Sequence, residues 1–281
     1  MEWRGNVNVR HDRAGLRDSG SAGRPSLAAV DVLPRRTLRD EVLLVLGVSL
    51  GASAVYAIVD IIGRLTARQA LSQQQATLNP SQAPGRPWLD LSYQLLGIAT
   101  ALVPALLAVH LLGRDHGSAA EPLGLRPRRA AFDAGAGAGL AALIGIPGLA
   151  LYFGARAVGI NANVVPEALP HVWWALPVLV LSAIQNAVLE EVVVVGYLVT
   201  RLRQLGWAVP AVIAGSALLR GSYHLYQGFG GFAGNAIMGV IFVLFFLRFR
   251  RVAPLVIAHA TIDTVSFVGY ALLHGHVSFL N

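Results

Sequence analysis

The chain has 281 residues, of which 55% are hydrophobic and 13% are charged, and its mean hydropathy is +0.58. A soluble domain usually carries about 25% charged residues, so the composition argues against a soluble protein. Cysteine is absent, which excludes disulfides, a cysteine nucleophile and a thiolate metal site. The formal charge is +7, and all 22 positively charged residues are arginines. Because they cluster beside apolar runs, membrane topology explains them better than a nucleic-acid partner.

Residues 1–40 are polar, rich in glycine and arginine, and show no apolar period, so we expect a disordered cytoplasmic tail. Residues 41–281 are expected to form one membrane domain. It contains apolar segments that each approach the ~20 residues needed to cross the hydrocarbon core. They are residues 41–63, 89–113, 131–156, 173–203, 207–224, 231–249 and 253–273. The expected fold is an all-α polytopic integral membrane helix bundle of about seven transmembrane helices, with eight as the alternative because the fourth segment is long.

The arginines also predict the orientation of the bundle. Seventeen of the 22 lie in the tail or in the loops that alternate with it across the membrane. The loops on the other side carry four, which are Arg64, Arg68, Arg86 and Arg156. The positive-inside rule therefore places the N-terminus of this multi-pass cell-membrane protein in the cytosol. Seven spans would then place the C-terminus outside.

Small residues in the third segment predict close packing. Gly135 and Gly139 form a G-x-x-x-G motif, with Gly137 between them. This spacing indicates either a specific helix contact or the ordinary glycine and alanine content of membrane helices.

Ionisable residues inside the late apolar segments are the strongest functional signal. An Asp or Arg at a helix centre costs roughly 2.5–3.5 kcal/mol on insertion scales, so such groups need partners. The residues concerned are Glu190, Glu191, Arg220, His224, His259 and Asp263. They can satisfy one another only if the three segments that carry them pack together. Such a cluster either joins helices structurally or forms a catalytic or transport site, and its place within the membrane favours function.

Three short motifs carry these residues. Residues 190–195 read EEVVVV, residues 220–224 read RGSYH, and residues 259–263 read HATID. In this order the motifs resemble E-E-x-x-x-R, F-x-x-x-H and H-x-x-x-N/D of the CAAX-protease and bacteriocin-processing family, which includes type II CAAX prenyl endopeptidases. The resemblance covers about residues 173–273, which would hold the catalytic helices. The earlier segments are similar only as generic membrane helices.

The resemblance implies an intramembrane endopeptidase that acts on a peptide or membrane-protein substrate at the lipid bilayer. Glu190 would be the general base for the attacking water, and His224 would position or polarise that water. His259 and Asp263 would lie where the family stabilises the oxyanion. Peptide hydrolysis independently requires an activated water and a stabilised oxyanion. Because a carboxylate at Asp263 donates no hydrogen bond unless it is protonated, its alternative role is to orient His259.

Two positions depart from the family motifs. Val195 stands where the family has arginine, and Arg220 stands where it has phenylalanine. A buried glutamate pair still needs a counter-charge, so we expect Arg220 to lie within ion-pair distance of Glu191 or Glu190. The two glutamates are about 100° apart on an α-helix. We therefore expect one to face the reaction while the other meets a structural partner.

No cofactor is expected, because the resemblance favours a metal-free glutamate mechanism. Two histidines and two or three carboxylates nevertheless form a set that zinc can use. Two other functions stay open. A non-catalytic membrane scaffold or immunity-type protein of the same fold is favoured by the missing motif arginine. A proton-coupled carrier would use the same buried acids, but carriers often show paired, interrupted helices, and this sequence shows no such symmetry.

Overall fold

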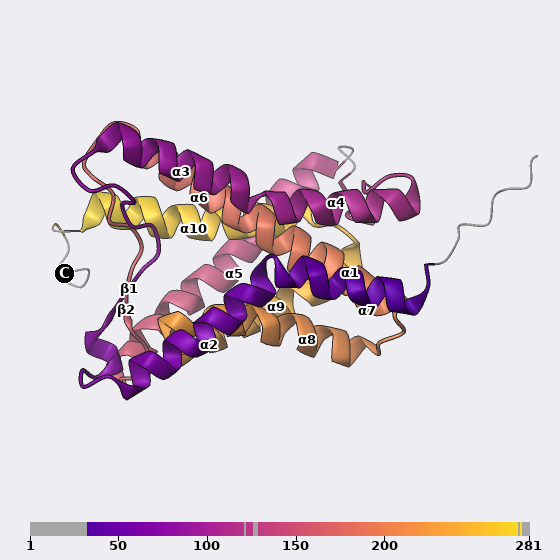
Figure 1. Ribbon diagram of the computed structural model, residues 1–281, viewed down its shortest axis with the longest axis horizontal. Helices are drawn as coiled ribbons and strands as arrows, with labels where there is room; N and C mark the ends of the chain where they lie inside the picture. Colours follow the sequence, from indigo (N-terminus) through magenta and orange to yellow (C-terminus); the bar gives the residue numbers. More distant parts are fainter. Residues whose placement is uncertain (1–32, 121, 126–128, 275, 277–281) are drawn as a thin grey trace, which may run out of the picture. The chain divides into compact units, whose positions relative to one another are not determined.

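The computed structural model describes residues 33–120, 122–125, 129–274 and 276. Most of the expected tail, residues 1–32, therefore lies outside the described residues. The chain divides into residues 1–31 and 32–281, and the described residues belong to the second unit. Helices dominate this unit, as Figure 1 shows, so the all-α fold is confirmed.

In chain order the helices are α1 (Arg35–Gly47), α2 (Leu50–Thr66), α3 (Pro87–Ala101), α4 (Val103–His116), α5 (Ala130–Ala157), α6 (Ala175–Glu190), α7 (Leu198–Gln204), α8 (Val209–Tyr223), α9 (Phe229–Phe249) and α10 (Ala253–Leu273). A π-helical segment, η3 (Glu191–Tyr197), joins α6 to α7. The remaining elements are the 3-10 turns η1 (Leu71–Gln73) and η4 (Leu225–Gln227) and the strands β1 (Gln75–Thr77) and β2 (Asn163–Val165).

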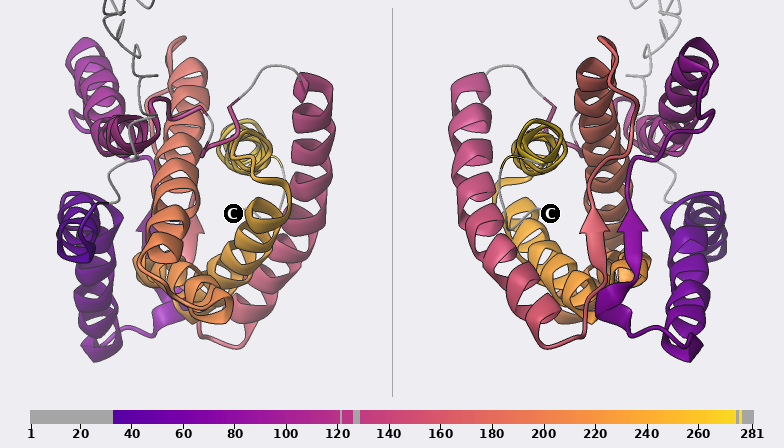
Figure 2. Two further views of the ribbon diagram at one scale, coloured as in Figure 1. Left: turned by 90° about the vertical axis from the view of Figure 1, so that its right-hand side faces the viewer. Right: turned by 90° about the vertical axis from the view of Figure 1, so that its left-hand side faces the viewer.

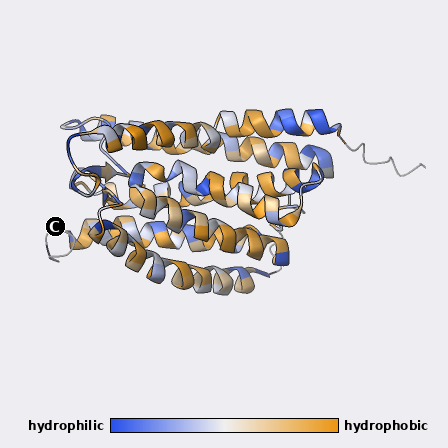
Figure 3. Cartoon of the chain, turned by 90° about the horizontal axis from the view of Figure 1, so that it is seen from below, coloured by the Kyte–Doolittle hydropathy of each residue, from blue (hydrophilic) through white to orange (hydrophobic). Residues whose placement is uncertain are grey.

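Five helical runs among the described residues are long and apolar enough to cross a membrane. They are Pro87–Asp115, Ala130–Ala157, Ala175–Gln204, Phe229–Phe249 and Ala253–Leu273. A sixth is present if α1 and α2 together form one span. Figure 3 shows hydrophobic residues along most of the helix length and many hydrophilic ones at the two ends. The chain is therefore a multi-pass membrane bundle.

The expected number of seven spans is not confirmed. The fifth expected segment, residues 207–224, corresponds to α8, which has 15 residues. A helix of this length extends about 22 Å, whereas the hydrocarbon core is about 30 Å thick. By length alone, α8 falls short of a full crossing.

The first expected span, residues 41–63, is a pair of helices bent by 52°. A Cβ atom at Gly51 would come within 2.6 Å of the carbonyl oxygen of Leu46, so the glycine permits the close approach at the bend. The first helix begins at Arg35. Residues 35–40, which we assigned to the tail, are therefore helical.

Two short strands join loops that are far apart in sequence. Strand β1 pairs in parallel with β2, with Gln75 opposite Asn163, and Figure 2 shows the two side by side. The loop after α2 and the loop after α5 therefore lie at one end of the bundle. The arginine pattern also assigns these two loops to one side of the membrane. In Figure 1, α1 begins at the opposite end and α10 ends near the strands.

The close contact of α5 is made by Gly137. A Cβ atom there would lie 2.6 Å from Cγ2 of Ile257 on α10. At Gly135 and Gly139 nothing in the described part of the chain lies within 4 Å of that position. Of the two interpretations of the G-x-x-x-G spacing, the described residues show no close contact at Gly135 or Gly139, because Gly137 is about 200° around the helix from both glycines and faces the opposite side.

The run α6–η3–α7 is the most enclosed of the five spans. About 67% of its apolar window is buried, against 17–33% for the other four. The helix that carries the glutamate pair is therefore surrounded by other helices rather than by lipid.

Candidate active site

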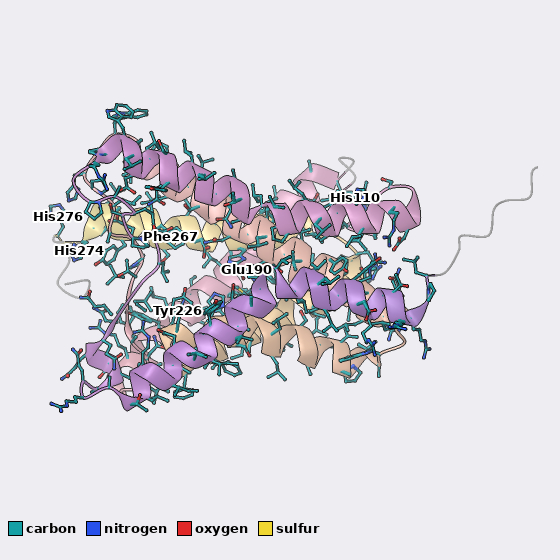
Figure 4. All side chains as sticks on the ribbon, in the orientation of Figure 1. His110, Glu190, Tyr226, Phe267, His274 and His276 are labelled. Carbon is teal, nitrogen blue, oxygen red and sulfur yellow. The ribbon has the colours of Figure 1, made fainter. Side chains whose placement is uncertain are left out.

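The glutamate pair lies where the central helix changes its winding. Helix α6 ends at Glu190, and the π-helix begins at Glu191. Short π-helical segments are frequent at functional sites. Glu191 is fully buried and Glu190 is 8% exposed, and Figure 4 places Glu190 near the middle of the bundle. The two carboxylates are therefore held away from both ends of the bundle.

The residues after Glu191 account for the local change. Four consecutive valines follow it, and β-branched side chains have low helix propensity. The hydroxyl of Ser216 on α8 donates to the carbonyl oxygen of Val194 at 2.9 Å. A Cβ atom at Gly196 would lie 2.5 Å from Leu123, so this glycine lets the loop after α4 approach. The widened segment is therefore supported from two neighbouring elements.

Arg220 on α8 binds both glutamates. Its Nη2 donates to Oε2 of Glu190 at 3.0 Å, and its Nη1 donates to Oε2 of Glu191 at 3.1 Å. Nη2 also contacts Oε1 of Glu191. The predicted ion pair is confirmed. The two glutamates share this partner, because the guanidinium fork presents several donors and the π-helix alters the angle between consecutive residues.

The guanidinium of Arg220 is itself fully buried. It lies 5.2 Å from the ring centroid of Phe242 on α9, a cation–π contact that strengthens when water is excluded. A Cβ atom at Gly239 would lie 3.3 Å from Cδ of Arg220 and 3.0 Å from Cα of Ala217. The glycine therefore leaves the space that the long side chain fills.

His259 on α10 completes the contact between three helices. Its Nδ1 lies 2.8 Å from Oε1 of Glu191 and 3.1 Å from Nη2 of Arg220. Because the contact with the carboxylate is shorter and the guanidinium cannot accept, Nδ1 is best assigned as a donor to Glu191. Nε2 lies 3.6 Å from Oδ2 of Asp263. From this position Asp263 can orient the imidazole.

Tyr223 and His224 lie at the end of α8. The Tyr223 hydroxyl donates to Oε2 of Glu190 at 2.8 Å. Nδ1 of His224 lies 3.1 Å from the carbonyl oxygen of Arg220. A carbonyl only accepts, so Nδ1 carries the proton, and Nε2 of the neutral ring presents a lone pair. Among the described residues, His224 makes no direct hydrogen bond to Glu190.

Sequence reasoning missed Tyr223. It lies three residues after Arg220 and therefore shares a helix face with it, which was the available signal. A tyrosine within an apolar segment is common enough that its hydroxyl alone does not mark a site.

The loop between α5 and β2 forms hydrogen bonds with the residues that follow the turn carrying His224. Asn161 is buried and its Oδ1 accepts a hydrogen bond from the backbone nitrogen of Gly231 at 2.9 Å. The backbone nitrogen of Phe229 donates to the carbonyl oxygen of Ile160 at 2.9 Å. Gly228 has φ +111°, which glycine adopts readily. Sequence reasoning did not identify Asn161, because no motif marks this loop.

The carboxylates and His259 also form a possible metal-ligand set. Glu190, Glu191 and His259 each offer a ligand atom, and these atoms all lie within 4.8 Å of one another. Nη2 of Arg220 lies within 3.1 Å of an oxygen or nitrogen of all three residues. The guanidinium therefore occupies the place that a cation would take, and a metal ion would have to displace it.

Comparison with known proteins confirms the resemblance of the motifs. Residues 172–265 match the family model described as type II CAAX prenyl endopeptidase Rce1-like. This family is a protease family, and the matched segment contains the whole buried cluster described above. No curated protein and no solved structure matches the chain.

Proposed function

We propose that the chain is an intramembrane endopeptidase in which Glu190 activates a water molecule for attack on a membrane-proximal peptide bond. One observation carries this proposal. Oε2 of Glu190 accepts hydrogen bonds from Arg220 and Tyr223, whereas Oε1 accepts none from the described residues. The first oxygen fixes the carboxylate, and the second is available to take a proton from water.

The distribution of charge supports Glu190 as the base. Arg220 makes two contacts with Glu191 and one with Glu190. Glu191 therefore balances most of the guanidinium charge, and Glu190 keeps its negative charge in an apolar setting. Val195 in place of the motif arginine favoured a non-catalytic scaffold. Arg220 supplies that charge from α8, which removes the main reason for the scaffold interpretation.

The remaining groups suit the other steps of hydrolysis. Water donates one hydrogen to Oε1 of Glu190 and one to Nε2 of His224, so its lone pair faces the peptide carbonyl. As Glu190 takes the proton, the water oxygen bonds to the carbonyl carbon, and the C=O electron pair moves to the oxygen. His259, as an imidazolium protonated at both nitrogens, stabilises this oxyanion by donating from Nε2, whose 3.6 Å contact with Asp263 is longer than a normal hydrogen bond. Glu190 then returns the proton to the leaving amine as the C–N bond breaks.

The proposed mechanism needs no metal ion. Arg220 already supplies positive charge between Glu190, Glu191 and His259. A zinc ion at the same place would bring two further charges beside a guanidinium that stays protonated. We also propose that the N-terminus faces the cytosol, because the arginines are concentrated on the corresponding loops.

The decisive experiment compares cleavage of a peptide library by the purified full-length protein and its Glu190→Gln variant. The substitution keeps the size and both hydrogen-bond acceptor contacts, so the variant should unfold at nearly the same temperature as wild type. Cleavage should fall at least about 100-fold, since general-base catalysis typically contributes that much or more. Glu167→Gln, in the loop after β2, is the matched control and should cleave normally. Full activity of Glu190→Gln would exclude Glu190 as the base.

A further inference from the structure

An apolar groove of about 640 Å³ lies between α1, α7 and α8. Its floor is formed by aliphatic side chains, which include Val42, Leu46, Leu198, Leu202 and Leu219. None of the residues of the proposed active site lines it. The groove is therefore separate from that site, and a ligand could bind in it whether or not the chain is a protease.

The mouth of the groove is strongly basic. Arg35, Arg36 and Arg39 line it from the first turns of α1. The side chains of Arg36 and Arg39 are 87% and 65% exposed, and both share Asp40 as an acidic neighbour, at 3.8 and 3.4 Å. The carboxylate of Asp40 can balance only one of the three positive charges that line the mouth. At least two positive charges at the mouth are left for a ligand.

The position of the groove matches one leaflet of a bilayer. The basic mouth is at the end of α1 where the described chain begins, opposite the strands in Figure 1. Trp207, which lines the groove and is 46% exposed, is of the type that is enriched at membrane interfaces. From Arg35 to Leu46 the helix rises about 16 Å, close to half of the ~30 Å hydrocarbon core. One acyl chain can therefore lie along the floor while its headgroup meets the arginines.

We propose that this groove binds an anionic phospholipid, with its phosphate on Arg35, Arg36 and Arg39 and one acyl chain on the leucine floor. The choice of an anionic lipid rests on charge complementarity, because each basic side chain near a membrane surface attracts anionic headgroups. The choice of a lipid over a soluble anion rests on the apolar floor, which a free phosphate would leave uncovered.

The test measures quenching of Trp207 fluorescence by lipids with brominated acyl chains. The full-length protein is reconstituted with brominated phosphatidylglycerol or brominated phosphatidylcholine, and the signal of Trp207 is obtained by difference from a Trp207→Phe variant. Wild type should be quenched by phosphatidylglycerol at a concentration at least about tenfold lower than by phosphatidylcholine, given the attraction expected for several arginines.

Two variants separate headgroup recognition from chain binding. The triple variant Arg35→Gln/Arg36→Gln/Arg39→Gln should lose the preference. The control Arg68→Gln/Arg86→Gln/Arg156→Gln removes the same charge at the other end and should retain it. Gly215→Leu fills the floor without changing charge, because the nearest atoms to a Cβ there belong to the groove residues Trp207 and Leu202, at 3.7 and 3.9 Å. It should weaken quenching by phosphatidylglycerol.

Three outcomes would overturn the proposal. Equal quenching of wild type by both lipids would exclude anionic selectivity. A second outcome combines two results: the arginine variant loses the preference for phosphatidylglycerol, but Gly215→Leu is quenched as fully as wild type. This would mean that headgroups adsorb to a basic surface and that no acyl chain enters the groove. Removal of the preference by inorganic phosphate at constant ionic strength would identify a soluble anion site instead.

Discussion

Replacing Arg220 with leucine tests how the buried charges are balanced. The change leaves Glu191, which is fully buried, and Glu190, which is 8% exposed, without their shared cation. Removing one partner of a buried ion pair typically costs about 3–5 kcal/mol. Because two carboxylates lose the same partner, we expect the free energy of unfolding to fall by about 5 kcal/mol. Cleavage should fall as well, since Oε2 of Glu190 loses a donor.

A double-mutant cycle separates the interaction energy between Arg220 and Glu191 from the effect of removing either side chain alone. Unfolding and cleavage are measured for wild type, Arg220→Leu, Glu191→Leu and the double variant. Replacing both members of a buried pair by apolar residues often costs little. The double variant should therefore be more stable than Arg220→Leu alone, with a coupling energy of about 2–3 kcal/mol.

Arg251→Leu is the control for a general loss of stability. It removes the ion pair with Asp133, in which Nε and Oδ1 lie 2.5 Å apart and which joins the segment between α9 and α10 to the first turn of α5. This variant should also be less stable, but its remaining folded protein should cleave at the wild-type rate. Additivity of the two substitutions in the cycle would refute the proposed coupling. Equal loss of cleavage in Arg251→Leu and Arg220→Leu at equal folded fraction would refute a specific role of Arg220 in the site.

Four further changes test separate parts of the structure. Tyr223→Phe removes one hydrogen bond to Glu190, so kcat should fall about five-fold, equivalent to about 1 kcal/mol, with KM unchanged; steady-state kinetics would show whether it does. A metal chelator should leave cleavage unchanged, because the guanidinium occupies the only place where the described residues gather such a ligand set; inhibition that zinc reverses would speak for a metal enzyme. A reporter fused after Asn281 should be found outside the cell, as the arginine distribution predicts, and a cytosolic reporter would contradict this topology. Gly239→Leu should reduce stability and cleavage by colliding with α8, whereas Gly269→Leu, with nothing within 4 Å of its Cβ position among the described residues, should have little effect in either assay.

Hydropathy located the helices well because membrane helices are sustained apolar runs with polar ends. The expected segments 131–156, 231–249 and 253–273 agree with α5, α9 and α10 to within two residues at each end. The mean hydropathy of an apolar segment does not report the backbone hydrogen-bond pattern, so it does not predict the π-helix after Glu190. It also cannot detect strand pairing between loops as distant as those of Gln75 and Asn163.

The buried cluster was predictable in part for an energetic reason. Glu190, Arg220 and His259 cannot remain in apolar helices without partners, so their presence predicts mutual contact. Asn161 gave no such signal, because a buried amide is readily satisfied by backbone groups. Arg201 is one of the 17 arginines that the positive-inside argument assigns to the tail and its alternating loops. It is fully buried and contacts acidic side chains on α1 and α4, which a count of charges cannot reveal.

The cation beside the glutamates comes from Arg220 and not from position 195, so it lies on a different helix from the glutamate pair. An arginine at position 195 would belong to the same helix as the pair, whereas Arg220 belongs to α8. Any displacement of α8 therefore alters the hydrogen bonds to Oε2 of Glu190. The neighbouring residue Leu219 lines the groove that we assign to an anionic lipid. A lipid seated there would press against α8 one residue away from the guanidinium, so cleavage should depend on lipid headgroup charge in wild type and should lose that dependence in Gly215→Leu.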